Sequence, residues 1–508
     1  MAVKINTASY VGIKGNIVTV EVDICNGLPS FNIVGLANTA IKESKERVRA
    51  AIVNSGFEFP VSKITVNLAP ADLKKDGSLF DLPVAIGILL ATEQVYFKDV
   101  EKYLLMGELS LNGELKKIQG ALPLIIEGIE NNINNFIVPL ENVKECSSVK
   151  KANIYPLNNL KQVINYITYR DLMPYEFEEV SYEKLNYNVD FKDVVGQESC
   201  KRAIEIAAAG NHNILMFGPP GSGKTMIAER IPTILPKLNY KEALEVTKIY
   251  SVSGNLDKEL GLIYCRPFRN PHHTISKISL VGGGNKLMPG EISLAHNGIL
   301  FLDEILEFKK NVLEVLRQPL ESKQIKISRM NGTVCYPANF MLVGAMNPCP
   351  CGFYLSKTSK ECTCSDYDIK RYLAKLSGPL LDRIDVFTFV NSLSYKEINS
   401  KISSESSENM RKRVEKARKL QLNRFEKENI YYNSDMNGKL IKKYCELDDT
   451  SNKLLEKIYT KFGLSNRAYT RILKLARTIA DLNENKNILK QDIIEALQYR
   501  KFINNKIV

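Results

Sequence analysis

One stretch of the chain combines glycines, a lysine and a threonine in the spacing that binds nucleotide phosphates. It is NILMFGPPGSGKTMIAER, in which residues 218–225 fit G-x-x-x-x-G-K-[ST]. The four apolar residues before the motif predict a buried strand, and the residues after it predict an amphipathic helix. In that setting backbone N–H groups can surround phosphates, Lys224 can neutralise their charge, and Thr225 can bind Mg²⁺. The expected phosphate loop consists of Gly218, Pro219, Pro220, Gly221, Ser222, Gly223, Lys224 and Thr225.

Polar side chains that could hydrolyse a bound nucleotide follow two further apolar runs. In NGILFLDEI a predicted strand ends in Asp303 and Glu304. Asp303 can hold Mg²⁺ through water, and Glu304 can polarise the attacking water. The next run, NFMLVGAMNP, ends in Asn347, which we expect to orient the same water. These residues predict hydrolysis of ATP with Mg²⁺ rather than nucleotide binding alone.

Arginines further along the chain could stabilise the charge that develops on the γ-phosphate. Arg383 in GPLLDRID could reach the nucleotide of a neighbouring subunit, and Arg467 or Arg471 in LSNRAYTRIL could act as a second phosphate sensor. Each of these arginines alone is equally compatible with a surface salt bridge. Their order along the chain, after the phosphate loop and the acidic pair, favours the catalytic interpretation.

The compartment decides how the cysteines are interpreted. The start of the chain, MAVKINTASYVG, lacks the pattern of a signal peptide, and the longest apolar run, from Leu82 to Ala91, is too short to span a bilayer. We therefore expect a cytoplasmic protein that does not associate with membranes. Its ten cysteines should then be reduced, which disfavours disulfides.

Four of the cysteines lie close together in PCPCGFYLSKTSKECTC. Two C-x-C arms separated by ten residues can place four thiolates around one tetrahedral Zn²⁺, although C-x-x-C arms are more usual. Structural zinc is the favoured interpretation, and unliganded thiols or redox chemistry are the alternatives. The candidate ligands are Cys349, Cys351, Cys362 and Cys364.

The elements that must position these residues divide the chain into four regions. Residues 1–170 mix alternating strands, as in NIVTVEVDI, with a helix in FDLPVAIGILLATEQ, and predict an α+β domain. Residues 171–190 are polar and tyrosine-rich, as in a linker. Residues 191–390 show the strand–loop–helix units of an α/β nucleotide-binding core. Residues 391–508 are mostly helical.

The helical region is also strongly basic. It has 25 Lys and Arg against 15 Asp and Glu, so it accounts for +10 of the net charge of +12. Such a domain suits a polyanionic partner, most simply DNA, although a solvated basic surface is the alternative. The stretch from Arg411 to Lys427 has eight basic residues against two acidic ones, with Val414, Ala417 and Leu420 as an expected packing side.

Two loops of the core could contact DNA phosphates. In ESKQIKISRMNGTVCYPANF, alternating residues turn at Asn331, which predicts a β-hairpin presenting Lys323, Lys326 and Arg329. The glycine-rich loop SLVGGGNKLMPGE adds Lys286. A solvated hairpin without a DNA partner is the alternative.

The order of these motifs resembles that of AAA+ ATPases. FRNPHHTIS, PGEISLAHNGILFLDE and AMNPCPCG further resemble the magnesium-chelatase-like family called YifB or ComM, over essentially the whole chain. The resemblance implies a homo-oligomer in the form of a hexameric ring that hydrolyses ATP and drives DNA branch migration. A chelatase-like or chaperone-like ATPase that remodels a protein partner is the competing hypothesis.

The first region resembles the Lon protease domain, a ribosomal-protein-S5-like fold, in KKDGSLFDLPVAIG and MGELSLNGELKKIQGALPLIIEGIENNINNFIVP. Lon-type proteolysis needs a serine nucleophile and a lysine base. The serine position is best matched by Leu79, with Ser78 one place off, and the lysine position falls on Leu124. The resemblance therefore implies the fold without peptidase activity.

Overall fold

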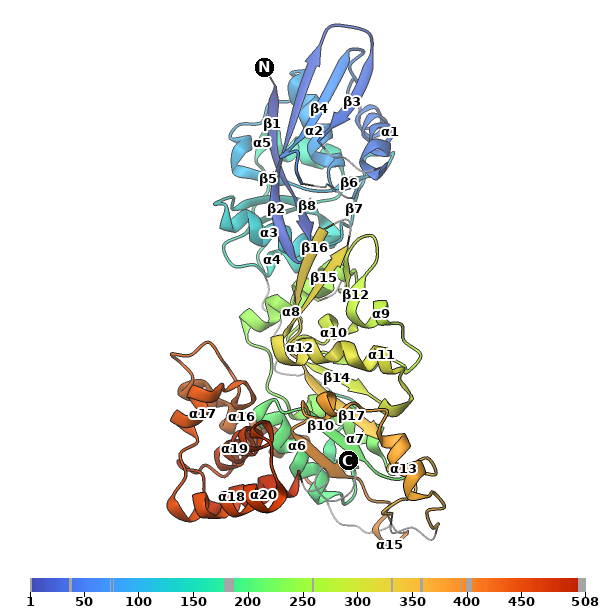
Figure 1. Cartoon of the computed structure of the whole chain (residues 1–508). Coiled ribbons are helices and arrows are strands. Elements are labelled where there is room, and N and C mark those ends of the chain that lie inside the picture. Colours follow the sequence, from blue (N-terminus) through green and yellow to red (C-terminus); the bar gives the residue numbers. More distant parts are fainter. Residues whose placement is uncertain are drawn as a thin grey trace. The chain divides into compact units, whose positions relative to one another are not determined.

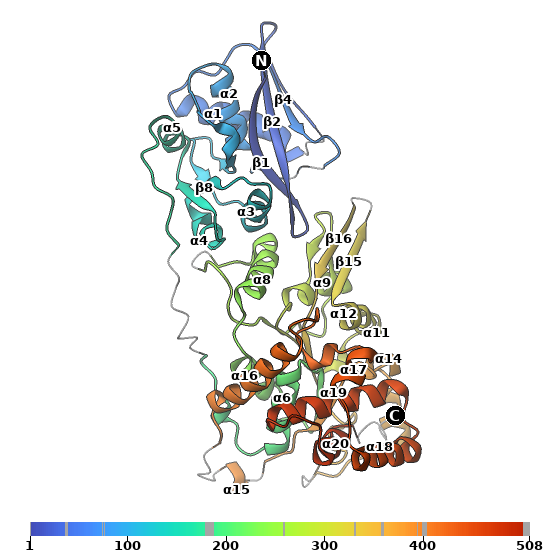
Figure 2. The ribbon, with the colours of Figure 1, turned by 90° about the vertical axis from the view of Figure 1, so that its left-hand side faces the viewer.

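The computed structural model describes residues 2–35, 39–73, 75, 77–177, 187–257, 260–329, 332–356, 360–393, 395–398 and 404–500. The chain forms two compact units, whose elements are labelled in Figures 1 and 2. The first unit contains Met1–Tyr182 and Tyr240–Ile263, and the second contains Glu183–Asn239 and Tyr264–Val508. Among the helices in the described ranges, none combines the length and apolar character that a bilayer-spanning segment requires.

A seven-stranded mixed sheet is the frame of the first unit, in the order β3-β4-β2-β1-β5-β8-β9. Strand β2 is antiparallel to β1 and β4, whereas β5, β8 and β9 continue the sheet in parallel from β1. Along β2, Val18, Val20 and Val22 are fully buried, as the alternation of this strand predicts. The strands are β1 (Val3–Val11), β2 (Lys14–Cys25), β3 (Ser30–Val34), β4 (Lys63–Ala69), β5 (Tyr103–Leu105), β8 (Asn135–Pro139) and β9 (Asn153–Leu157), with a small pair β6 (Glu108–Leu109) and β7 (Leu115–Lys116).

Helices α2 and α3 pack on β1 and β2. Helix α2 is buried from Asp81 to Leu89, and Gly87 lies so close to Val22 that a Cβ there would approach its side chain to 2.6 Å. The predicted helix with Pro83 near its start is thus confirmed. The helices of this part are α1 (Thr39–Asn54), α2 (Asp81–Ala91), α3 (Ala121–Glu130), α4 (Val143–Ser147) and α5 (Leu160–Tyr169), and the short 3₁₀ turns are η1 (Val100–Lys102) and η2 (Leu140–Asn142).

Helix α8 (Tyr240–Ser253) belongs to the first unit, although the sequence analysis placed it in the α/β core of residues 191–390. Its buried residues follow a helical spacing, and α8 packs against α3. Polar contacts complete the packing, since the Ser251 hydroxyl donates to Glu145 (2.8 Å) and the Gln119 amide donates to the carbonyl of Val252 (2.7 Å). The amphipathic pattern shows that this segment is a helix, but it does not show which sheet the helix covers.

The second unit is built on five parallel strands in the order β11-β14-β17-β10-β18. Every residue of β10, β14 and β17 is buried, which matches the unbroken apolar runs of a parallel sheet covered on both faces. Strand β10, which leads into the phosphate loop, lies between β17 and the edge strand β18, so the loop emerges one strand in from this edge of the sheet. The strands are β10 (Ile214–Phe217), β11 (Phe268–Arg269), β14 (Ile299–Leu302), β17 (Met341–Met346) and β18 (Val386–Phe389).

The remaining elements of the second unit surround this sheet or extend from it. Two hairpins pair β12 (Gly282–Gly283) with β13 (Met288–Pro289) and β15 (Gln324–Arg329) with β16 (Gly332–Pro337). The helices up to β18 are α6 (Glu198–Gly210), α7 (Lys224–Arg230), α9 (Lys277–Val281), α10 (Glu291–Leu294), α11 (Lys310–Leu313), α12 (Arg317–Ser322), α13 (Asp366–Leu373) and α14 (Gly378–Leu381). The 3₁₀ turns are η3 (Phe191–Asp193), η4 (Ile231–Ile234), η5 (Ile305–Glu307), η6 (Glu314–Leu316) and η7 (Asn433–Asp435).

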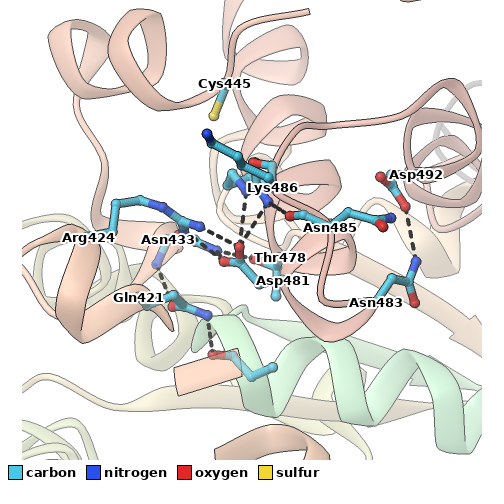
Figure 3. A network of polar contacts seen from close by, with 12 residues as sticks. Gln421, Arg424, Asn433, Cys445, Thr478, Asp481, Asn483, Asn485, Lys486 and Asp492 are labelled. Atoms are coloured by element: carbon cyan, nitrogen blue, oxygen red, sulfur yellow. Dashed lines mark hydrogen bonds and ion pairs between the residues drawn. The ribbon is translucent and has the colours of Figure 1, made fainter. Parts of the chain in front are cut away.

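The C-terminal helices lie in the same compact unit as the α/β core. Helices α16 and α19 pack on α6, and the Gln421 amide donates to the carbonyl of Ala209 (3.0 Å). Figure 3 shows the polar network behind this packing, in which the fully buried Asp481 accepts hydrogen bonds from Arg424 and Asn433 (both 2.8 Å). These helices are α15 (Tyr395–Ile398), α16 (Ser407–Arg424), α17 (Gly438–Tyr444), α18 (Asp449–Phe462), α19 (Asn466–Leu482) and α20 (Lys490–Gln498).

The basic helix α16 packs by the expected side except at one position. Val414 and Ala417 are buried as predicted, but Leu420 is 41% exposed, and the side continues instead through Gln421. The step of four residues from Ala417 to Gln421 follows the helical repeat more closely than three. Most of its basic residues bind acidic residues of the same unit, in the pairs Arg411–Glu415, Lys412–Glu408, Arg413–Glu205, Arg413–Glu405, Lys416–Glu484 and Arg424–Asp481.

Candidate functional site

The phosphate loop joins β10 to the start of α7 at Lys224. Gly223 has a φ of +89°, a left-handed conformation that favours glycine. At Gly218 a Cβ would lie 2.2 Å from the carbonyl oxygen of Val390, so the close approach of this loop to the end of β18 requires glycine there. The motif residues are therefore explained by the backbone path as well as by phosphate binding.

The ammonium group of Lys224 lies inside the loop. Its Nζ donates to the carbonyls of Gly218 (2.8 Å) and Pro219 (2.9 Å) and to the side-chain oxygen of Asn347 (3.2 Å). Burial lowers the pKa of Lys224 below its usual value. The charges of Asp303 and Glu304 raise this pKa, but they do not offset the effect of burial. Because β10 and β17 are neighbouring parallel strands, Asn347 emerges at the same edge of the sheet as the loop.

The acidic pair follows β14 at that edge. The Thr225 hydroxyl donates to Asp303 Oδ2 (2.6 Å), which places both candidate Mg²⁺ ligands together. Glu304 has a φ of +46°, a conformation that is strained for a residue with a side chain, and its N–H donates to Asp303 Oδ1 (2.9 Å). The chain thus turns sharply after the strand and leaves Glu304 exposed next to Asp303.

The residues present fit a nucleotide with Mg²⁺. Among the described residues, the hydroxyl of Ser222 in the phosphate loop is buried and has no hydrogen-bond partner, whereas buried hydroxyls normally have one. A phosphate oxygen could accept from it. Thr225 and Asp303 supply the oxygen ligands that Mg²⁺ prefers.

The three candidate arginines, Arg383, Arg467 and Arg471, all line one pocket of about 620 Å³, and no residue of the phosphate loop lines it. Arg383 is 8% exposed and binds Glu321, the carbonyl of Arg317 (3.1 Å) and the carbonyl of Pro379. Arg467 is largely exposed, with a long contact of 3.9 Å to Asp382. The structure therefore brings Arg383 and Arg467 together, but in a pocket separate from the nucleotide-binding edge of the same chain.

The other sensor candidate, Arg471, has a structural partner. It forms an ion pair with Asp385, whose second oxygen lies 3.3 Å from Nδ1 of His212. Burial alone would raise the pKa of Asp385, but Arg471, His212 and Arg500 hold it well below its usual range. The ion pairing of Asp385 was not predicted from the sequence. The only signal was its place beside Arg383, just before an apolar strand.

The expected hairpin is present as β15 and β16, and it extends away from the parallel sheet (Figure 1). The turn residue Asn331 lies outside the described residues. Lys326 and Arg329 are exposed, whereas Lys323 forms an ion pair with Asp435 in the pocket described above. Lys326 and Arg329 are therefore the better placed of the three to meet a DNA phosphate.

The glycine-rich loop packs against this hairpin. The hydroxyl of Tyr336 on β16 donates to the carbonyl of Leu287 (2.8 Å), and a Cβ on Gly282 would come within 2.9 Å of Ile327. Lys286, next to Leu287, is exposed. The two candidate DNA-contacting segments thus form one structural feature, which we call the double hairpin (residues 282–290 and 324–337).

The four clustered cysteines come together in space. Their sulfur atoms lie within 4.8 Å of one another, and this is the one group of metal-ligating side chains found among the described residues. The cluster is compatible with a structural zinc ion.

The positions that would hold a Lon-type dyad are apolar. Leu79 and Leu124 are both buried in the core of the first unit, and the Ser78 hydroxyl donates to the carboxylate of Glu108. Neither leucine can act as a nucleophile or a base. The absence of peptidase activity stays a prediction.

Known protein families match most of the chain. Residues 190–398 match the family described as magnesium chelatase, subunit ChlI. Residues 20–142 match the family described as subunit ChlI of Mg-chelatase, and residues 404–500 match its C-terminal region.

The chain is also similar to individual proteins, to two of them over nearly its whole length. The chain is 43% identical over 499 residues to the competence protein ComM of Haemophilus influenzae, covering 97% of this chain and 96% of that protein. It is 42% identical over 500 residues to the uncharacterized protein YifB of Escherichia coli, with 98% and 96% covered. The magnesium-chelatase 38 kDa subunit of Cereibacter sphaeroides is 25% identical over 181 residues, covering 31% of this chain and 52% of that protein.

Proposed function

Since the chain belongs to the YifB/ComM family of magnesium-chelatase-like AAA+ proteins, we propose that it is an ATP-hydrolysing motor that binds and remodels DNA. Its cofactors are ATP and Mg²⁺, with a structural Zn²⁺. The observation that supports the motor best is the convergence of Lys224, Asn347, Thr225 and Asp303 at one edge of the parallel sheet.

The side chains at this edge divide the work of hydrolysis. Bound Mg²⁺ would neutralise phosphate charge, held by Thr225 and Asp303. Lys224 and the N–H groups at the start of α7 bind the phosphates. Glu304, which is exposed beside Asp303, polarises the attacking water, and Asn347 orients it.

We further propose that Arg383 and Arg467 act on the nucleotide of a neighbouring subunit, because their shared pocket is lined by none of the phosphate-loop residues. This requires a homo-oligomer, and a hexameric ring is the form that the family implies. In such a ring the arginines of the next subunit complete each nucleotide-binding site.

Mixing two inactive variants tests this arrangement. Lys224→Ala and Arg467→Ala are each expected to hydrolyse ATP poorly, but a mixed oligomer regains activity, because some interfaces pair an intact phosphate loop with an intact arginine. The ATPase rate is measured against mixing ratio. Arginines that act within their own chain would give no recovery at any ratio. Arg383→Ala serves as a second partner, with thermal unfolding checked because Arg383 is buried.

We propose DNA as the substrate of the motor. The double hairpin supports this, because its exposed cations Lys286, Lys326 and Arg329 make no ion pair among the residues the structure describes. The name of the relative from Haemophilus influenzae, competence protein, is consistent with a role in DNA uptake or recombination. Branch migration is the remodelling reaction that the family resemblance implies.

Replacing Lys326 and Arg329 with alanine is expected to weaken DNA binding uniformly across sequences. The slope of log K against log salt should fall by about 1.4 for single-stranded DNA, since each phosphate contact contributes about 0.7. Fluorescence anisotropy at several salt concentrations measures the DNA affinity and its salt dependence. The matched control is Lys412→Ala with Lys419→Ala, which removes the same charge from exposed positions of α16. Equal losses in the two double variants would contradict a specific role for the hairpin.

A further inference from the structure

The four sulfurs of the cysteine cluster lie close enough together to bind one metal ion. Cys349 Sγ lies 3.3 Å from Cys351 Sγ and 3.7 Å from Cys362 Sγ, and the last two sulfurs are 3.5 Å apart. Four thiolates around Zn²⁺, each at about 2.3 Å, lie about 3.8 Å from one another. The sulfurs are therefore already placed as the ligands of one ion, with no coordination position left for a substrate.

Backbone donors support the sulfurs, as outer contacts support the ligands of metal sites. The N–H of Tyr354 donates to Cys349 Sγ (3.3 Å), and the N–H of Cys351 donates to Cys364 Sγ (3.4 Å). Such contacts hold the two sulfurs in place.

The cysteine cluster lies directly against the phosphate loop. Gly352, next to Cys351, has a φ of +86°, and a Cβ there would lie 2.6 Å from Cδ of Pro220 and 3.3 Å from its Cγ. The N–H of Gly352 donates to the carbonyl of Cys349 (3.0 Å), which closes the turn that makes this contact. Pro220 is the third residue of the phosphate loop, so a turn containing two metal ligands touches the loop itself.

A second connection runs through the backbone. Asn347, which accepts from Lys224, lies two residues before Cys349. The cluster therefore holds both the segment that orients Asn347 and the turn that contacts Pro220. A metal ion bound by both cysteine arms would crosslink this loop and so lower the entropy cost of holding it closed.

We propose that the four cysteines bind one Zn²⁺ and that the turn of residues 349–352, which we call the zinc turn, positions the phosphate loop through the contact of Gly352 with Pro220. The zinc ion takes no part in hydrolysis. The positioning role rests on the proposed ATPase function, whereas zinc binding and nucleotide affinity can be measured without any turnover.

Metal content and nucleotide affinity of the full-length protein test the proposal. Protein purified without chelator is expected to contain about one zinc per chain. Cys364→Ser should lose the zinc and weaken the binding of a fluorescent ATP analogue by about 10-fold. Cys25→Ser, an exposed cysteine of the first unit, is the control and should change neither. Wild-type protein without zinc, with all four thiols freely titratable, would overturn the proposal.

A pair of glycine variants tests the positioning contact while all four cysteines remain. Gly352→Ala should retain the zinc but weaken analogue binding by about 10-fold or more, because the Cβ displaces Pro220. Gly56→Ala is the matched control, since Gly56 has a φ of +87° and no atom within 4 Å of its Cβ position. Normal affinity in zinc-containing Gly352→Ala would overturn the positioning role. If the wild type binds zinc and nucleotide but does not hydrolyse ATP, the proposed motor fails while these measurements still decide the zinc turn.

Discussion

Replacing Lys224 with alanine is expected to reduce ATP turnover by at least about 100-fold. The ammonium lies within hydrogen-bond distance of Asn347 and two carbonyls of the phosphate loop, where it can stabilise negative charge on the phosphates. Removing one such positioned partner of a developing anion costs roughly 3–4 kcal/mol in the transition state. The phosphate-release rate under saturating ATP and Mg²⁺ measures the loss.

Lys419→Ala is the matched control for this variant, because Lys419 is an exposed lysine of α16. Its turnover should equal that of the wild type. Full activity in Lys224→Ala, with thermal stability unchanged in both variants, would place ATP hydrolysis elsewhere in the molecule.

Glu304→Gln is expected to separate nucleotide binding from hydrolysis. The amide can still accept a hydrogen bond from water but is a far weaker base, and loss of a general base lowers turnover by about 10²- to 10⁴-fold. Glu304 is exposed, and its N–H bond to Asp303 is a backbone contact, so the fold and the affinity for ATP should persist. Equilibrium binding of a nucleotide analogue and single-turnover hydrolysis measure the two properties.

The nearby Glu307→Gln provides the control, because Glu307 is an exposed carboxylate at the end of η5 that pairs with Lys375. Its turnover should change little. If Glu304→Gln and Glu307→Gln lose the same activity, Glu304 has no special role toward water.

The nucleotide-binding edge could be predicted from the sequence because its signals are local. The phosphate loop is a continuous motif, and Asp303 and Asn347 each follow a buried apolar run. The carboxyl ends of parallel strands lie at a common edge of the sheet. The phosphate loop, Asp303 and Asn347 are therefore expected to lie close together. The contacts of Thr225 with Asp303 and of Lys224 with Asn347 confirm that meeting.

Other features depend on tertiary packing that the sequence pattern does not contain. Helix α8 lies between two parts of the core along the chain but packs on the first unit, through contacts such as that of Ser251 with Glu145. Lys323 was grouped with the hairpin cations, yet its position at the base of β15 lets it reach Asp435. A one-dimensional pattern shows which face of an element is apolar and leaves its partner open.

The contact of Gly352 with Pro220 also could not be predicted from the sequence. The cysteine segment lies between Asn347 and Arg383 in the sequence, but only the folded structure shows that its turn touches the phosphate loop. The signal was a glycine directly after a cysteine, which by itself indicates no more than a tight turn.

The ATPase rate with and without single-stranded or forked DNA shows whether this protein is an ATPase motor that acts on DNA. DNA is expected to raise the rate of the wild type. That stimulation should vanish in Lys224→Ala and Glu304→Gln, and should be reduced when Lys326 and Arg329 are replaced with alanine. An ATPase that DNA does not stimulate, together with no salt-dependent DNA binding, would contradict the account and favour a protein-remodelling ATPase.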